Sequence, residues 1–407
     1  MCRCRERCSN TFVSTVYTVS DPKPENERAA ILSSSGRSAR IQMKKTKALC
    51  VFTTILGNKA TTQRLIDALE GMANVEPTFV LLTAEDYRRY PAPRLARLTD
   101  AWESRYIARA KISDMQGGPF DILLVNSWEF VTEFQDLARR LPAAVLMDAV
   151  PSTVDFQLRR RGDGGLRRTV ATWLNDVPFS RAVKHFEYFL PMGSDCADAL
   201  QARYQVPAEH MTVTLAPQDL NFWTPGPKSS PDSFRLLFVA NDFARKGGEF
   251  LLRLYTEHLS TWCSLTIASN DPALENRTLP QGVFLRRGLN REAIRQLYRD
   301  SDLFVFPTRQ DYMPQVLAEA LATGLPCIAN DVGGIRDLVR DGETGFLMTC
   351  KMPTDAWAKR IEELRADKGR LDRLALGARA FAEQKLDTDA FSKLVARVAD
   401  RLIAARH

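Results

Sequence analysis

The sequence predicts an α/β protein of two doubly wound, Rossmann-like domains that face each other across a cleft, with a C-terminal helix. From residue 46 onward, short apolar runs alternate with longer amphipathic stretches. A stretch rich in Pro, Gly and Ser at 224–233 interrupts this alternation, which then restarts. Strand–helix–strand crossovers imply parallel sheets, and strands that are apolar throughout imply helices on both faces.

The chain divides into five predicted segments. These are a disordered N-terminal extension at 1–42, a first domain at 43–223, a linker at 224–233, a second domain at 234–388, and a C-terminal helix at 389–407. The expected strands of the first domain are 47–54, 78–82, 121–125, 143–147, 188–192 and 212–216. Those of the second are 234–240, 264–269, 282–287, 302–308, 326–331 and 345–349. Helices are expected at 61–72, 195–206 and 389–406, among others.

Composition limits the class of protein. The 407 residues are 45% hydrophobic and 26% charged, which is ordinary for a globular protein of two domains. The net charge of +7 favours anionic partners and is compatible with nucleic acid, acidic lipid or nucleotide phosphates. No run approaches the roughly 20 apolar residues of a membrane span, and the N-terminus lacks the apolar core of a signal peptide. We therefore expect a cytoplasmic location, with Met43 as a natural beginning of the fold.

The eight cysteines predict no disulfide framework. Five of them lie far apart in apolar contexts and are typical of reduced core thiols. The other three, Cys2, Cys4 and Cys8, could form a metal-binding knuckle, but no fourth ligand lies nearby. We expect that they belong to the disordered extension.

A pair of carboxylates follows the strand expected at 302–308. Asp311 precedes a helix that is expected to begin near Pro314, and Glu319 lies within that helix. Ionised carboxylates only accept hydrogen bonds, so each suits a pair of sugar hydroxyls. The N–H groups of the helix's first turn favour an anion between them. The alternative is an N-cap at Asp311 and a solvated Glu319.

Three glycine-containing loops lie at the ends of other strands of the second domain. Arg245 and Lys246, followed by Gly247 and Gly248, would neutralise a diphosphate that approaches the backbone closely, although a solvated basic loop is also compatible. Gly333 and Gly334 form a second loop, and Gly288 lies in a third that could flank a base.

Together these elements resemble the donor-binding half of GT-B glycosyltransferases, specifically glycosyltransferase family 4. The segments that carry the resemblance are FVANDFARKGG, at 238–248, and DYMPQVLAEALATGLPCIANDVGGIRDLV, at 311–339. The resemblance extends more weakly to residues 189–225, which include Asp219. In all, the resemblance covers roughly residues 46–390.

The resemblance implies a role for each matching residue. Glu319 would bind the ribose and Asp311 the sugar hydroxyls. Arg245 and Lys246 would hold the diphosphate, and backbone N–H groups in the stretch of Tyr312, Met313, Pro314 and Gln315 would approach the phosphates or the sugar.

The sequence departs from the family in two places. Asn241 occupies an early position of the phosphate loop where the family often has arginine. The family also often has a histidine at the end of a strand in the first domain, and none of the four histidines here follows such a strand. Asn126 and Asp148 do follow strands, so both are candidates for that place.

The acceptor side is less well defined. Gly57, Asn58 and Lys59 follow the first strand and could line it, although an ordinary turn is at least as compatible. The basic stretch 158–186, with interspersed aromatics, could contact an anionic membrane or be a solvated helix. The DTD sequence at 387–389 could bind metal, but it precedes the last helix and predicts an N-cap.

The resulting hypothesis is a glycosyltransferase that uses a nucleoside diphosphate sugar, a UDP or GDP sugar, with no obligatory metal and no nucleic acid. The family resemblance alone implies that it is a retaining enzyme. The acceptor would be a glycan or a lipid-linked saccharide of polysaccharide biosynthesis. A nucleotide-sugar epimerase and a non-catalytic binding protein are the alternatives. Base, sugar, acceptor and oligomeric state are not predicted.

Overall fold

The computed structural model describes most of the chain after residue 44. The described residues are 45–54, 59–90, 92–93, 100–113, 119–154, 166–228 and 233–406. They belong to one compact unit, Lys44–His407. The predictions made for residues 1–42, Gly57, Asn58, the three early cysteines, Arg159 to Arg161 and part of the linker lie outside the described residues.

The first half contains a parallel sheet of five strands in the order β2-β1-β3-β4-β5. The strands are β1 Thr46–Thr53, β2 Val75–Leu82, β3 Ile122–Val125, β4 Ala143–Met147 and β5 Tyr188–Pro191. These confirm five of the six expected strands. The sixth, at 212–216, is wrong: only the isolated bridges Phe189↔Met211 and Met192↔Thr214 form there. Pro191 has no N–H to donate, which limits a ladder beside β5.

The helices of the first half lie between and after these strands. They are α1 Lys59–Glu70, α2 Asp86–Arg89, α3 Asp100–Ser113, α4 Trp128–Glu133, α5 Gln135–Ala138, α7 Leu166–Ala182, η3 Val183–His185, α8 Ser194–Tyr204 and η4 Ala208–His210. The helices expected at 61–72 and 195–206 are confirmed as α1 and α8, with ends shifted by one or two residues.

The second half contains a parallel sheet of six strands in the order β11-β10-β9-β6-β7-β8. All six expected strands are confirmed, as β6 Phe234–Val239, β7 Cys263–Ala268, β8 Val283–Arg286, β9 Leu303–Phe306, β10 Cys327–Asn330 and β11 Gly345–Met348. Its helices are α9 Gly248–Leu254, η5 Tyr255–Leu259, η6 Pro272–Leu274, α10 Arg291–Asp300, α11 Gln315–Ala322, α12 Ile335–Leu338 and α13 Thr354–Ala366. The strand order reverses between β6 and β9, and ligands of such sheets bind beyond that point.

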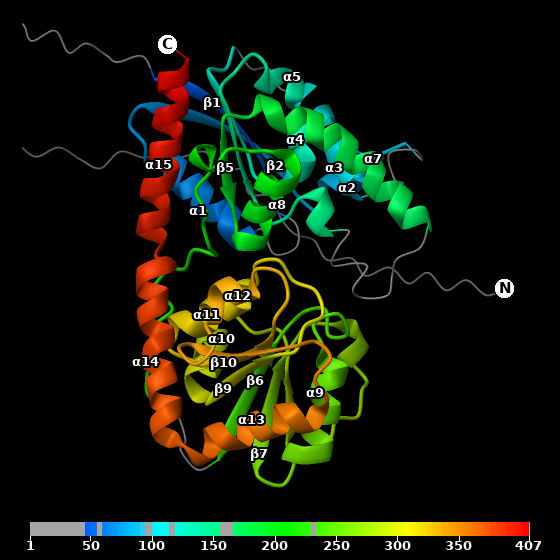
Figure 1. Cartoon of the computed structure of the whole chain (residues 1–407), viewed down its shortest axis with the longest axis vertical. Coiled ribbons are helices and arrows are strands. Elements are labelled where there is room, and N and C mark those ends of the chain that lie inside the picture. Colours follow the sequence, from blue (N-terminus) through cyan, green and yellow to red (C-terminus); the bar gives the residue numbers. More distant parts are fainter. Residues whose placement is uncertain are drawn as a thin grey trace, which may run out of the picture. The chain divides into compact units, whose positions relative to one another are not determined.

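The last two helices, α14 Lys368–Lys385 and α15 Thr388–Ala405, connect the two halves. α14 packs against α11, whereas α15 packs against α1 beside the first sheet (Figure 1). Asp387 accepts hydrogen bonds from the backbone N–H groups of Asp389 and Ala390, which confirms the predicted N-cap. None of the described helices is long and apolar enough to cross a bilayer.

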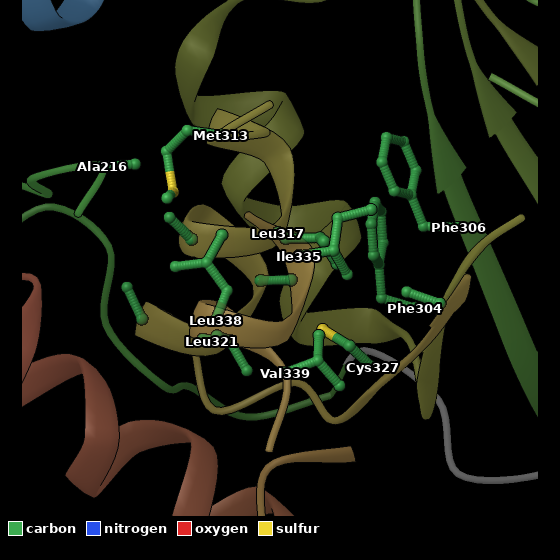
Figure 2. Packing of buried hydrophobic residues seen from close by; sticks show 14 of the residues in the cluster. Ala216, Phe304, Phe306, Met313, Leu317, Leu321, Cys327, Ile335, Leu338 and Val339 are labelled. Carbon is green, nitrogen blue, oxygen red and sulfur yellow. The ribbon is translucent and has the colours of Figure 1, made fainter. Parts of the chain in front are cut away.

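The core of the second half orients α11. Leu317 and Leu321 are fully buried in one cluster with residues of β9 and α12, among them Phe304 and Ile335 (Figure 2). Burying a leucine side chain stabilises the fold by about 1.5–3 kcal/mol. At 3.6 residues per turn, the burial of these leucines places Gln315 and Glu319 on the opposite face of the helix.

Cys50, Cys196, Cys263 and Cys327 are buried thiols that form no disulfide. Burial raises the pKa of the Cys263 thiol to about 12. These four are therefore core thiols, as the sequence predicts.

Candidate functional site

The loop after β6 lies against the end of β9. Gly247 has φ of +88°, and a Cβ there would lie 2.1 Å from the carbonyl oxygen of Pro307. A Cβ on Gly248 would lie 2.3 Å from the ring of Phe243. Only glycines allow this packing. The loop is thereby held beside the residues that follow β9, at the point where the strand order reverses.

Lys246 and Asp311 form an ion pair across these two loops. The side chains of both are largely buried, and Lys246 Nζ lies 5.5 Å from the centroid of the Phe306 ring. Arg245 is ion-paired with Asp242 and donates from Nη1 to the carbonyl oxygen of Gln310 at 3.2 Å. The alternative interpretation as a solvated basic loop is therefore wrong for Lys246, because its ammonium group is enclosed and paired with Asp311, one of the two predicted acids.

The segment between Asp311 and α11 is packed rather than open. The helix begins at Gln315 with Pro314 as its N-cap, so Asp311 is not the cap. The Tyr312 N–H donates to Asp311 Oδ1, and the Tyr312 carbonyl accepts from Gly334 N–H at 2.7 Å. Met313 is buried. The backbone N–H of Tyr312 thus already has a partner, whereas the resemblance implies that it would approach the phosphates or the sugar.

Glu319 lines a pocket of about 640 Å³, a volume that includes open solvent. The pocket is lined by Trp223, Val239, Asn241, Ala268, Ser269, Asn270, Arg286, Gly288, Leu289, Asn290, Arg291, Ile294 and Glu319. Tyr298 donates to Glu319 Oε2 at 3.1 Å. Burial raises the pKa of the Glu319 carboxyl to about 7, although Tyr298, Arg64 and Arg291 oppose that rise. The alternative interpretation of Glu319 as a solvated side chain is therefore wrong.

Asn270 connects the two other predicted pocket residues. Its side-chain oxygen accepts from Gly288 N–H at 2.8 Å, and its own N–H donates to Asn241 Oδ1 at 2.9 Å. Gly288 has φ of +62°, and no atom lies within 4 Å of a Cβ built there. Asn241 is exposed. Both predicted residues thus face the same pocket as Glu319.

Sequence reasoning missed Arg291, Tyr298 and Arg64. Arg291 lies at the pocket wall, and its Cζ atom is 4.2 Å from the centroid of the Phe222 ring. No local pattern separates it from the two other arginines of α10. Tyr298 reads as an ordinary core residue, and Arg64 lies in the other half of the chain.

Asp148 and Asn126 differ in their surroundings. Asp148, directly after β4, is partly buried, and burial together with the charge of Asp311 raises its carboxyl pKa to about 6. Burial also raises the pKa of Tyr312 to about 12, with further contributions from Asp148 and Asp311. The structure thus brings Asp148 from the first half within electrostatic range of Asp311 and Tyr312.

Asn126 uses both ends of its amide to hold β1 beside β3. Its oxygen accepts from Thr53 N–H at 2.7 Å, and its nitrogen donates to the Thr53 carbonyl at 3.2 Å and the Thr62 hydroxyl at 2.7 Å. It is also buried. These bonds favour a structural role for Asn126, which leaves Asp148 as the polar strand-end residue near the second half.

We expect Asn126→Ala to lower the free energy of unfolding by about 2–3 kcal/mol, because it leaves the buried Thr62 hydroxyl and the partly buried backbone groups of Thr53 without these partners. Urea unfolding followed by circular dichroism measures this difference. The control is Asn221→Ala at an exposed position, which should change stability by less than about 0.5 kcal/mol. Equal effects of the two variants would contradict the structural role.

The remaining predictions concern the acceptor side. Lys59 is the exposed first residue of α1. In the basic stretch, Trp173 is 62% exposed, Arg181 and Lys184 are exposed, and Phe179 is buried.

Asp219 accepts hydrogen bonds from the backbone N–H groups of Asn221 and Phe222 in a turn. In the described part of the chain, no three His, Cys, Asp or Glu side chains are grouped so that they could hold a metal ion.

Known proteins resemble this chain in sequence over part of its length and in fold over most of it. Residues 233–367 match the family model described as Glycosyl transferases group 1. A D-inositol 3-phosphate glycosyltransferase from Rhodococcus erythropolis is 30% identical over 223 residues, which are 47% of this chain and 48% of that protein. Sucrose-phosphate synthase from Thermosynechococcus elongatus has a TM-score of 0.70 at 16% identity and covers 89% of this chain and 100% of its own. Anabaena HepE in complex with UDP-glucose has a TM-score of 0.63 at 16% identity, with coverages of 87% and 99%.

The two kinds of likeness support different statements. The family match confirms the resemblance for residues 233–367, and the structural likeness confirms the predicted GT-B fold. The matches to the curated relatives span between 19% and 52% of those proteins' own lengths. The activity of the whole protein is therefore a proposal.

Proposed function

We propose that the chain is a retaining glycosyltransferase that moves a sugar from a nucleoside diphosphate sugar to an acceptor hydroxyl. The observation that carries this proposal is the arrangement of the Lys246–Asp311 pair and the Glu319 pocket at the switch point of the second sheet. A nucleoside diphosphate sugar has a base and ribose for the pocket, a diphosphate for the cations and hydroxyls for the acids. The glycosyltransferase names of the curated relatives and the UDP-glucose complex of HepE support the same substrate class.

Each part of the donor has a partner in this proposal. The base enters the pocket beside Gly288 and Asn241, and the ribose hydroxyls donate to Glu319. Arg245 and Lys246 hold the diphosphate, helped by the N-terminus of α11. Asp311 accepts from sugar hydroxyls. In the absence of donor, Asp311 is the counter-charge of Lys246, which keeps the ammonium group in place for the incoming phosphates.

The reaction follows from these positions. The acceptor oxygen bonds to the anomeric carbon from the face on which the diphosphate departs, and the bond between that carbon and the diphosphate oxygen breaks. The acceptor proton passes to the departing diphosphate, whose charge Arg245 and Lys246 stabilise. Asp148, with a carboxyl pKa of about 6, is ionised at neutral pH and would orient the acceptor hydroxyl.

The acceptor and the location are also part of the proposal. The acceptor in this proposal is a saccharide or a lipid-linked saccharide in the cytoplasm. The exposed Trp173, Arg181 and Lys184 would contact anionic lipid at the inner face of the membrane, which the basic net charge favours. The charge stabilisation described above needs no obligatory metal.

The test is a thermal-shift screen of UDP-glucose, UDP-N-acetylglucosamine, GDP-mannose and ADP-glucose, followed by product analysis with saccharide acceptors. We expect at least one nucleotide sugar to raise the melting temperature, since a ligand that binds the native state stabilises it. Transfer should yield the donor's anomeric configuration and persist with EDTA. A new sugar isomer from donor alone would indicate an epimerase, and binding without transfer would indicate a non-catalytic protein.

A further inference from the structure

Arg64 is an arginine of α1 whose guanidinium group is enclosed near the nucleotide pocket. The residue is 8% exposed. Nη2 donates to the side-chain oxygen of Gln218 at 3.2 Å. Nη1 is buried and has no hydrogen-bond partner among the described residues. Enclosing a guanidinium costs free energy unless opposite charge lies nearby, so the position of this charge requires a reason.

Gln218 connects Arg64 to α11 in the second half of the chain. It is fully buried, and its nitrogen donates to Gln315 Oε1 at 3.0 Å. The Gln315 nitrogen in turn donates to the hydroxyl of Thr61, one turn before Arg64 on α1, at 3.1 Å. The side chains of Thr61, Arg64, Gln218 and Gln315 therefore form one polar junction between α1 and the first turn of α11. Gln315 and Glu319 are four residues apart and share a face of α11, so the junction lies beside Glu319.

The backbone at this junction is also held. Gln218 N–H donates to the carbonyl of Leu386, and the Gln218 carbonyl accepts from Thr388 N–H at 3.2 Å. These contacts tie the chain that leaves the first half to the chain that returns to it between α14 and α15. Arg64 is therefore bonded to a residue whose backbone is itself held by the segment between α14 and α15.

The charges around Glu319 come from two elements. Tyr298 of α10 donates a hydrogen bond to it, and the charges of Arg291, also on α10, and of Arg64, on α1, both favour its ionised form. The charges around Arg64 are Glu319, then Arg291, Asp219 and Asp67. Burial lowers the pKa of Arg64 to about 10, so the guanidinium stays positive at neutral pH. Glu319 thus has a permanent cation beside it that originates in the other half of the chain.

We propose that Arg64 is a positioning residue for the nucleotide site, because it holds Glu319 in the ionised form that accepts both ribose hydroxyls. Gln218 fixes the guanidinium where it acts, and the first half thereby controls nucleotide affinity without contacting the nucleotide. The inference rests on the proposed function for the role of Glu319. The charge coupling between Arg64 and Glu319 does not depend on it.

The coupling is measured without any ligand. Because the pKa of Glu319 in the fold is raised from 4.5 to about 7, its ionisation costs stability as the pH rises through that interval. Without Arg64 this cost grows. We expect the melting temperature of Arg64→Met to fall further below that of the wild type as the pH rises from about 5.5 to 8.5. The pH-dependent part should vanish in the Glu319→Gln background.

Arg105→Met is the matched control. Arg105 is also 8% exposed, bonds through Nε to the Glu129 carbonyl at 3.0 Å, and has a buried Nη2 without a partner among the described residues. It lies in α3, away from the pocket. We expect its stability loss to be the same in both Glu319 backgrounds. Arg64→Lys retains the positive charge and should restore most of the wild-type pH profile, whereas Arg64→Gln should not. If Arg64→Met does not fold, the comparison of the pH profiles of Arg64→Lys and Arg64→Gln tests the inference instead.

The nucleotide site is measured by calorimetry with the nucleotide sugar that stabilises the wild type most. At pH 7.5 we expect Arg64→Met to bind it about threefold more weakly, with the difference closing near pH 9. Identical pH profiles of the wild type and Arg64→Met would overturn the inference but leave the proposed function standing. A pH coupling in the melting temperatures without binding of any nucleotide sugar would refute both the proposed function and the positioning role.

Discussion

Lys246→Met should lower kcat for sugar transfer by about 10²–10³-fold at saturating donor. The departing diphosphate gains negative charge in the transition state, and removal of one positioned donor at such a site has effects of this size. Methionine is an unbranched side chain of similar length, but it lacks the ammonium group that lies near the Phe306 ring, so the substitution removes the charge and largely keeps the volume. Initial rates over a range of donor concentrations measure kcat and KM separately. We expect the larger change in kcat, because the charge develops as the bond breaks.

Two comparisons give this result its meaning. Lys359→Ala, at an exposed position of α13, should leave kcat unchanged. Lys246→Met removes the counter-charge of Asp311, so the double variant Lys246→Met with Asp311→Asn should recover stability but not activity. If Lys246→Met retained wild-type kcat, Lys246 would not stabilise the departing diphosphate.

The strands of the second sheet could be predicted because parallel strands are buried on both faces. β9 and β10 are buried at every residue, and their sequences are continuous apolar runs or nearly so. The segment 212–216 shows why this signal can mislead. It alternates polar and apolar residues like a strand, but its neighbour β5 ends in Pro191 and Val213 faces solvent. The hydrogen bonding of a neighbouring strand cannot be read from the segment itself.

Some residues of the candidate site could likewise be predicted from the sequence, and others could not. Lys246 and Asp311 could be predicted because each lies in the loop after a recognisable strand, and strand ends meet at one edge of a sheet. Glu319 could be predicted because it lies on the helix that follows Asp311. Arg64 and Gln218 could not be predicted, because their hydrogen bond joins residues 154 positions apart. Neither periodicity nor a local motif marks such a contact. Asn126 was found by its place after β3, yet only its partners show that it holds β1.

Glu319→Gln should weaken binding of the nucleotide sugar by roughly ten- to a hundredfold at pH 8, since hydrogen bonds to a charged group contribute about 1.5–3 kcal/mol. The wild type should also lose affinity as the pH falls through about 7, where the Glu319 carboxyl takes up a proton, and the variant should show no such dependence. A nucleotide sugar is the right probe, because a terminal phosphate would itself titrate in this range.

Calorimetry at a series of pH values from about 6 to 8.5 distinguishes the role of Glu319 in the nucleotide site from a role in stability alone. Glu362→Gln, at an exposed position of α13, removes the same charge from the same half of the chain and should keep the wild-type profile. A structural role would lower the melting temperature of Glu319→Gln and leave its affinity and pH profile unchanged. Because the carboxylate is enclosed beside Tyr298 and two arginines, a pH-independent affinity in the wild type would mean that the ribose does not reach it.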